Sequence, residues 1–232
     1  MKIILGVFSV ILLGLAATHP IKFFRRTESP KYQVIKKHHE FEDRLYDNST
    51  WLTMAVAGPQ LEAAQKEIYP HLYKYFQGQN SEGLKINWLT TVRTGIQSCY
   101  GASCATVFSM AFLIPEEHAK RAPQPVDPKV EIVNEPAARY AARAFYGSYT
   151  EETDWLRQAS KLAEKVQGDY TIDPTTYYLI SHSRPHDLIR NYSEILVKIE
   201  KKVHGAEGSI NPQTIHNATA VDNLNELFKK RE

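Results

Sequence analysis

The chain has 232 residues, of which 43% are hydrophobic and 23% are charged, and its formal net charge is +2. These proportions are ordinary for a globular protein and exclude a disordered, low-complexity composition. A charge so close to neutral also argues against nucleic acid as a partner, because proteins that bind nucleic acid usually carry a strong basic patch.

The first segment is typical of a secretory signal peptide. Lys2 is followed by an apolar run over residues 3–17 that ends in small residues. The run is shorter than the about 20 apolar residues that a membrane-spanning helix needs, and no later stretch is long and apolar enough. We therefore expect a signal peptide over residues 1–18, no membrane span, and an extracellular location. Residues 19–29 are basic and irregular and are interpreted as a leader.

The cysteines and the glycosylation motifs fit this secreted interpretation. Cys99 and Cys104 are the two cysteines of the chain. In a secreted chain they favour a disulfide that closes a short loop, whereas in a reducing compartment they are two free thiols. Sequons at Asn48, Asn191 and Asn217 indicate N-glycosylation in the secretory pathway.

Strand and helix patterns follow in chain order after the leader. Short apolar and β-branched runs predict strands over residues 32–35, 41–46 and 51–57. The spacing of apolar residues then changes to three and four, which predicts a helix from residue 60 to the glycine at 78; the apolar positions are Leu61, Ala64, Ile68, Leu72 and Tyr75. Pro70 lies inside this helix and predicts a kink or a break. Strands are predicted next over residues 85–92 and 105–114.

The second half of the chain repeats this order of elements. Strands are predicted over residues 130–133 and 139–146, and a helix follows between residues 150 and 168; its apolar face is formed by Leu156, Ala159, Leu162, Ala163 and Val166. Two further strands are predicted over residues 176–181 and 193–199, before a polar tail over residues 202–232. Each half thus has about four strands and one helix, which predicts an α+β fold with a curved or closed antiparallel sheet.

Motifs of catalysis and of metal binding are missing. The sequence has no Gly-x-Ser-x-Gly elbow, no glycine-rich phosphate loop, no His-Glu-x-x-His and no Cys-x-x-Cys. Adjacent His38 and His39 would point to opposite faces of a strand. His182 and His186 have ligand spacing only on a helix, which Pro185 argues against. We therefore expect no enzyme and no metal site made by protein side chains alone.

The first predicted helix carries a second aromatic face. Tyr69 and Tyr73 lie one turn apart beside Lys66, and Lys74 lies further round the helix. In one interpretation the tyrosines pack at the core edge with their hydroxyls in water. In the other they line a shallow cleft with lysines at its rim, which suits a flat apolar ligand with carboxylates, such as a tetrapyrrole. A tyrosine is a known ligand of haem iron.

Five segments between about residue 30 and residue 201 carry a family pattern. They are "YQVIKKHHEFEDRLYDNSTW", "YPHLYKYFQGQNSEGLKINWLTTVRT", "FSMAFLIPEEHAKRAPQPVDPKVEI", "RAFYGSYTEE" and "TTYYLISHSRPHDLIRNYSEILV". In this order they resemble the SOUL haem-binding protein family. The resemblance implies a distorted eight-stranded antiparallel β-barrel with two flanking helices, built from two similar halves. It also implies binding of haem or another tetrapyrrole without catalysis.

The resemblance also implies where the ligand binds. In haem-binding members the proposed cleft lies between the first helix and the loop before the last strand. On this chain the helix side falls on Lys66, Tyr69, Tyr73 and Lys74, and the loop side falls near His186. Under this hypothesis the lysines meet the propionates, and Tyr69, Tyr73 or His186 approaches the iron.

The chain departs from the family pattern in three places. Leu45 stands where one branch has a histidine proposed as an axial ligand, and Ser181 replaces a glycine. The segment that begins at Asn87 replaces the usual Met-Thr-x-Pro, with Thr91 where the proline is expected. These departures favour an alternative function, an extracellular protein-interaction module that kept the fold and lost haem. The sequence does not identify the protein partner of such a module.

Overall fold

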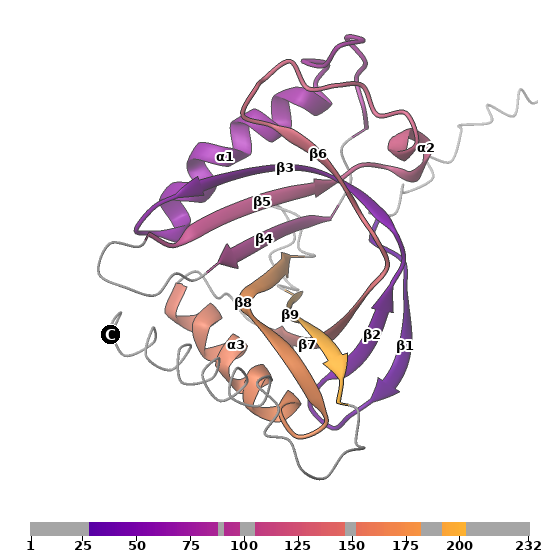
Figure 1. Cartoon of the computed structure of the whole chain (residues 1–232). Helices are drawn as coiled ribbons and strands as arrows, with labels where there is room; N and C mark the ends of the chain where they lie inside the picture. Colours follow the sequence, from indigo (N-terminus) through magenta and orange to yellow (C-terminus); the bar gives the residue numbers. More distant parts are fainter. Residues whose placement is uncertain (1–27, 88–90, 98–104, 147–151, 182–191, 203–232) are drawn as a thin grey trace, which may run out of the picture.

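The computed structural model describes residues 28–87, 91–97, 105–146, 152–181 and 192–202. This part of the chain forms one antiparallel sheet with helices against it (Figure 1). The strands are β1 (Tyr32–Lys37), β2 (Glu42–Tyr46), β3 (Ser49–Ala57), β4 (Val92–Gln97), β5 (Val107–Leu113), β6 (Glu131–Glu135), β7 (Ala138–Tyr146), β8 (Tyr170–Ser181) and β9 (Tyr192–Lys201). The helices are α1 (Leu61–Phe76), α2 (Glu116–Ala119) and α3 (Glu152–Val166). None of these helices is long and apolar enough to cross a membrane.

The strand order confirms the two similar halves. The sheet runs β1-β2-β7-β9-β8-β4-β5-β3-β6. Exchanging β2, β3, β4 and β5 with β6, β7, β8 and β9 gives the same order of these eight strands read from the opposite end, with the β4–β8 ladder at its centre. Each half therefore contributes four strands and one helix in the same chain order, and β1 and α2 are additions to the first half and to the connection between the halves.

The sheet curls because two strands bend at the same corner. β2 runs into β3 and β6 runs into β7, while β2 pairs with β7 and β3 pairs with β6. At the corner the Asn48 side-chain oxygen accepts a hydrogen bond from the Ala137 amide at 2.7 Å. In the described part of the chain β1 and β6 remain the two ends of the sheet, so the barrel is open and has nine strands. The family resemblance implies eight strands, and the ninth is β1, which pairs with β2 at one end of the sheet.

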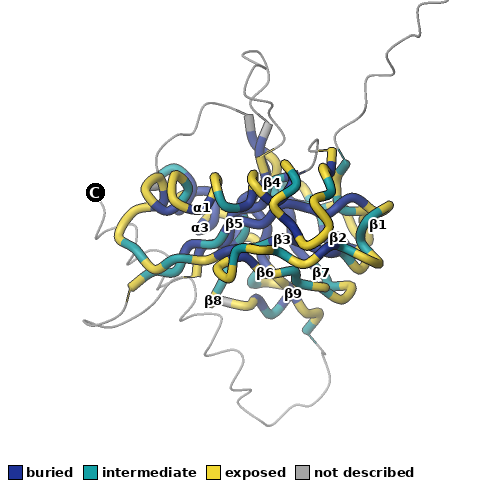
Figure 2. The backbone as a smooth tube through the Cα atoms, turned by 90° about the horizontal axis from the view of Figure 1, so that it is seen from above, coloured by how far each residue is buried: buried dark blue, intermediate teal, exposed yellow. Residues whose placement is uncertain are grey.

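Both helices bury the faces that the sequence predicts. α1 packs mainly on β3 and β5, and α3 packs on β7, β8 and β9. All of the predicted apolar positions of the two helices are buried. Figure 2 shows the buried residues in dark blue through the middle of the molecule and the exposed residues in yellow around it. The face of α1 that is turned away from the sheet remains exposed to solvent.

Two expectations for the elements are corrected by the structure. Of the predicted kink or break at Pro70 the break is absent, because α1 runs through this residue. Pro70 and Lys66 both lie on the solvent side of the helix, where water can replace the lost partner of the Lys66 carbonyl oxygen. The strand expected from residue 85 begins only at Val92, because the Ile86 amide is bonded to the Phe76 carbonyl oxygen at the end of α1.

Several predictions fall outside the described residues. They are the signal peptide, most of the leader, Cys99, Cys104, His186, Asn191, Asn217 and the tail from residue 203. Asn48 is described, and it is exposed at the corner between β2 and β3. Its side-chain nitrogen is the atom that a glycan would modify, so glycosylation there is compatible with its hydrogen bond to Ala137.

Candidate functional site

The outer face of α1 carries two stacked tyrosines. The rings of Tyr69 and Tyr73 are nearly parallel, at 10°, with centroids 6.0 Å apart. Each residue is 37% exposed, which is unusual for a large aromatic residue in this structure. The Tyr69 ring also meets the Phe112 ring of β5 at 5.7 Å and 66°. Both interpretations of the sequence therefore hold in part: Tyr69 touches the core, and the pair still presents aromatic surface to the outside.

The local environment affects the acidity of the Tyr69 hydroxyl. Partial burial raises the pKa of Tyr69, and the neighbouring Tyr73 raises it further. At neutral pH the Tyr69 side chain is therefore protonated. It can stack on a flat ligand or donate a hydrogen bond, and it becomes a metal ligand only if the metal displaces its proton.

A hollow of about 450 Å³ adjoins the C-terminal end of this face. Its walls are formed by Tyr73, Phe76, Gln77, Lys85, Ile86 and Asn87. Phe76 and Ile86 are almost fully buried, so the exposed lining of the hollow is mostly polar, and Lys85 adds a positive charge to it. Lys85 is not among the site residues predicted from the sequence, because the pattern of residues 85–92 predicts a strand.

The two lysines predicted from the helix are placed differently. Lys66 lies on the same side of α1 as the tyrosines, but its amino group is 2.7 Å from the Glu62 carboxylate. Lys74 directly follows Tyr73 and therefore points about 100° away from it around the helix. The structure thus brings together Tyr69 and Tyr73, with Lys66 paired at one end and Lys85 at the other.

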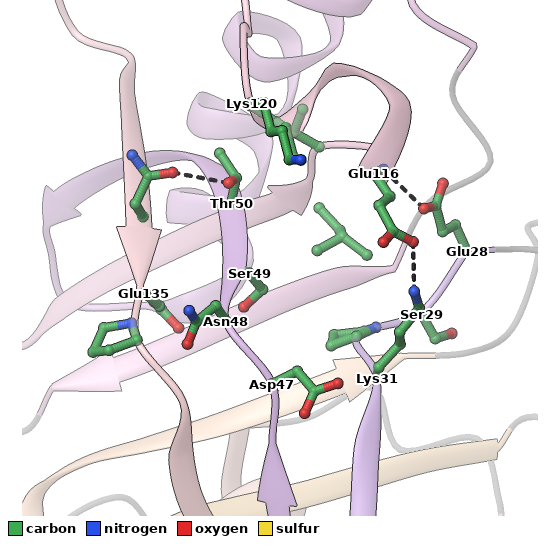
Figure 3. A pocket seen from close by; sticks show the side chains of 16 residues that line it. Glu28, Ser29, Lys31, Asp47, Asn48, Ser49, Thr50, Glu116, Lys120 and Glu135 are labelled. Atoms are coloured by element: carbon green, nitrogen blue, oxygen red, sulfur yellow. Dashed lines mark hydrogen bonds and ion pairs between the residues drawn. The ribbon is translucent and has the colours of Figure 1, made fainter.

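A larger hollow of about 740 Å³ lies at the bend of the sheet (Figure 3). Its lining comes from the start of β1, the β2–β3 corner, α2 and the end of β6. The lining includes polar contacts, since Lys31 pairs with Glu116 at 2.5 Å and Thr50 donates to Asn134, but most of its exposed surface is apolar. None of the described residues that line it is aromatic, whereas α1 exposes two tyrosine rings on which a flat ligand can stack, so α1 remains the candidate site despite its smaller hollow.

Another group of aromatic rings lies inside the curl of the sheet, where almost no free space remains. The Arg93 guanidinium lies 4.2 Å from the Trp51 ring centroid and 4.5 Å from that of Tyr178. It also donates a pair of hydrogen bonds to the Glu135 carboxylate. The free space here is about 20 Å³, which is room for about one water molecule. The side chains therefore fill this part of the interior and leave no room for a haem-sized ligand.

Comparison with known proteins assigns the chain to a family. The model of the SOUL heme-binding protein family matches residues 27–198, which is most of the chain. The chain belongs to the SOUL heme-binding family. Heme-binding protein 1 of Sus scrofa is 22% identical over 70% of this chain and 87% of that protein. Heme-binding protein 1 of Mus musculus is 23% identical with the same coverage.

A solved structure agrees with the family fold. The C-terminal domain of EcmrR aligns with a TM-score of 0.51 and 12% identity, over 74% of this chain and 99% of that domain. This likeness concerns the fold alone. Among the family departures, Leu45 lies in β2, whereas α1 packs mainly on β3 and β5. The missing histidine therefore leaves the tyrosine face of this SOUL family member unchanged.

Proposed function

We propose that this chain is a secreted protein that binds haem or a related tetrapyrrole without catalysis, as a carrier or scavenger. The observation that supports it most is the stacked, partly exposed pair of Tyr69 and Tyr73 beside a hollow that carries Lys85. Membership of a heme-binding family supports the ligand class. Secretion rests on the apolar run over residues 3–17, and the lack of catalysis rests on the missing motifs.

The residues of the α1 face fit a tetrapyrrole by their chemistry. The parallel tyrosine rings offer a surface for an aromatic macrocycle, and Lys85 of the adjoining hollow offers a positive charge for its carboxylates. A bound haem would bring an iron centre that takes an oxygen or nitrogen ligand. Tyr69, Tyr73 and His186 are the candidates for that ligand.

The direct test is a titration of the glycosylated mature protein with haemin, followed by absorbance in the Soret region. We expect a saturable one-to-one shift. The double variant Tyr69→Phe/Tyr73→Phe keeps both rings and removes both hydroxyls, so a change in its absorption bands would assign a tyrosine oxygen to the iron. An unchanged saturable shift would move the iron ligand elsewhere, with His186→Ala tested next. Binding no tighter than to an unrelated apolar protein would contradict the proposal.

The edge strand β1 favours a second candidate function. All six of its residues are exposed, including Tyr32, Val34 and Ile35. An exposed apolar edge strand is a common docking site for protein partners. The second candidate is thus an extracellular interaction module, in line with the departures at Leu45 and Thr91. Recovery of one protein partner from extracellular fluid by haem-free protein, lost in a Val34→Lys/Ile35→Lys variant, would support it.

A further inference from the structure

The connection that follows α1 is a fixed loop. The buried Asn80 side chain donates to the carbonyl oxygens of Tyr75 and Leu84, at 3.1 and 2.7 Å. Its oxygen accepts from the amides of Glu82 and Leu84, at 3.2 and 3.0 Å. Gly78 has a φ of 102°, which side chains rarely tolerate. These bonds hold the loop in one conformation.

This loop sets Lys85 beside the tyrosine face. The next residue, Ile86, is 3% exposed and packs in the same core cluster as Phe76. Its amide donates to the Phe76 carbonyl oxygen at 3.0 Å. The Lys85 side chain is exposed and passes close to Gly78, and it shares the hollow with Tyr73. Lys85 is thus a cation on a rigid support, next to one end of an aromatic surface.

The last carbonyl oxygens of α1, next to Lys85, already accept hydrogen bonds. A helix C-terminus normally disfavours anions because its last carbonyl groups lack partners. Here the last four are bonded: those of Tyr73 and Lys74 to the Gln77 amide, that of Tyr75 to the Gly78 amide, and that of Phe76 to the Ile86 amide. An anionic group beside Lys85 therefore meets a positive charge and bonded backbone groups.

The other lysines are less suited to the same task. The Lys66 amino group already faces the Glu62 carboxylate, so an anion there would compete with a fixed negative charge. Lys74 points away from Tyr73 around the helix. We infer that Lys85 binds an anionic group of the ligand, so that a flat ligand stacks on Tyr69 and Tyr73 with its carboxylate edge at the C-terminal end of α1. This inference rests on the proposed function and adds the ligand's orientation and its charge requirement.

The test compares three charge reversals, Lys85→Glu, Lys66→Glu and Lys74→Glu, in haemin titrations at low salt. All three lysines are exposed, so the variants should fold, as checked by circular dichroism and thermal unfolding. We expect Lys85→Glu to weaken binding about tenfold and the other two to change it less than about twofold. Lys85→Arg should keep most of the affinity. High salt should shrink the difference between the wild type and Lys85→Glu, because exposed charges are screened.

A second probe removes the charge from the ligand instead. Haemin dimethyl ester, which keeps the iron and lacks the free carboxylates, should bind the wild type and Lys85→Glu equally in dilute detergent. If the wild type binds haemin and Lys85→Glu binds it as tightly, the inference is wrong and the proposed function stands. The inference is also wrong if Lys66→Glu or Lys74→Glu has the larger effect. If the wild type shows no saturable binding, the proposed function and the inference both fail.

Discussion

The interior of the curled sheet and the outer face of α1 use the same residue types in opposite ways. Inside, aromatic rings surround a cation that the chain itself provides, and Arg93 is only 9% exposed. Outside, Tyr69 and Tyr73 stack on each other, with the Lys85 cation at one end of their surface. In the interior the carboxylate that pairs with the cation is Glu135 of the chain. On α1 we propose that the ligand provides it.

The two aromatic clusters differ in where their charges come from and in the space that they leave. A cluster whose cation and anion both come from the chain stabilises the fold and leaves no room for a ligand. A cluster with a rigid cation and exposed rings has the parts of a binding site. Changes in the interior should therefore reduce stability, and changes on α1 should reduce binding.

The largest effect on stability is expected for Arg93→Met. This variant leaves the Glu135 carboxylate without its partner in a mostly buried position and empties the space between Trp51 and Tyr178. We expect a loss of about 3 kcal/mol in the free energy of unfolding, measured in urea. Lys31→Met removes the exposed ion pair with Glu116 and should cost less than about 1 kcal/mol. Equal losses in the two variants would show that the interior pair has no special role.

A smaller and pH-dependent effect is expected for Asp43→Asn. Burial raises the pKa of Asp43, but the hydrogen bonds from Arg139 and Tyr170 outweigh burial and hold this pKa below its ordinary value of 3.8. The charged carboxylate therefore stabilises the fold above its unfolded-state pKa, and this stability is lost as the pH falls through the folded-state pKa. We expect a loss of about 2 kcal/mol at pH 7.

Urea unfolding at several pH values measures this dependence. The difference between the wild type and Asp43→Asn should be constant from about pH 5 upwards and should narrow below about pH 4. A difference that stays constant down to pH 3 would show that the charge of Asp43 contributes nothing.

A moderate loss is expected for Gly95→Ala in β4. Gly95 lies beneath the Tyr178 ring, and an added Cβ would clash with the Ser109 hydroxyl and lie 3.3 Å from the ring. We expect a cost of about 1–2 kcal/mol, detected as a lower midpoint in thermal unfolding. Gly168→Ala, whose Cβ would meet nothing within 4 Å, is the matched control and should be close to neutral. A neutral Gly95→Ala would mean that the interior can expand without cost.

The smallest effect on stability is expected for Tyr69→Phe/Tyr73→Phe. Both side chains are partly exposed, and the variant keeps both rings in place. The free energy of unfolding in urea should therefore change by less than about 0.5 kcal/mol. A loss above about 2 kcal/mol would assign the tyrosine hydroxyls to the fold rather than to a ligand.

The sequence predicted the elements that depend on periodic burial. The apolar faces of α1 and α3, the strand-rich halves and their repeated order all follow from spacings of two, three and four residues. Leu72 and Leu162 illustrate this, since both are fully buried at the predicted helix faces. The position of Tyr69 and Tyr73 on one shoulder of α1 also follows from helix geometry alone.

The features that depend on long-range contacts could not be predicted from the sequence. The loop before β4 is held by Asn80, whose four hydrogen bonds have no signature in a hydrophobic pattern. For this reason Lys85 was assigned to a strand and missed as a site residue. The bend at Asn48 and the stacking of Arg93 on Trp51 likewise join strands from different parts of the sheet. Periodicity places a side chain on a face, but only the fold shows which partners that face meets.

The most direct measurement is a haemin titration of Tyr69→Ala/Tyr73→Ala beside the wild type and Tyr32→Ala, monitored by Soret absorbance. Tyr32 is 42% exposed on β1 and serves as an equally exposed tyrosine on another surface. We predict saturable one-to-one binding by the wild type and Tyr32→Ala, and binding weakened at least tenfold in the α1 variant. Binding of equal strength by all three proteins would contradict a ligand site on the tyrosine face of α1.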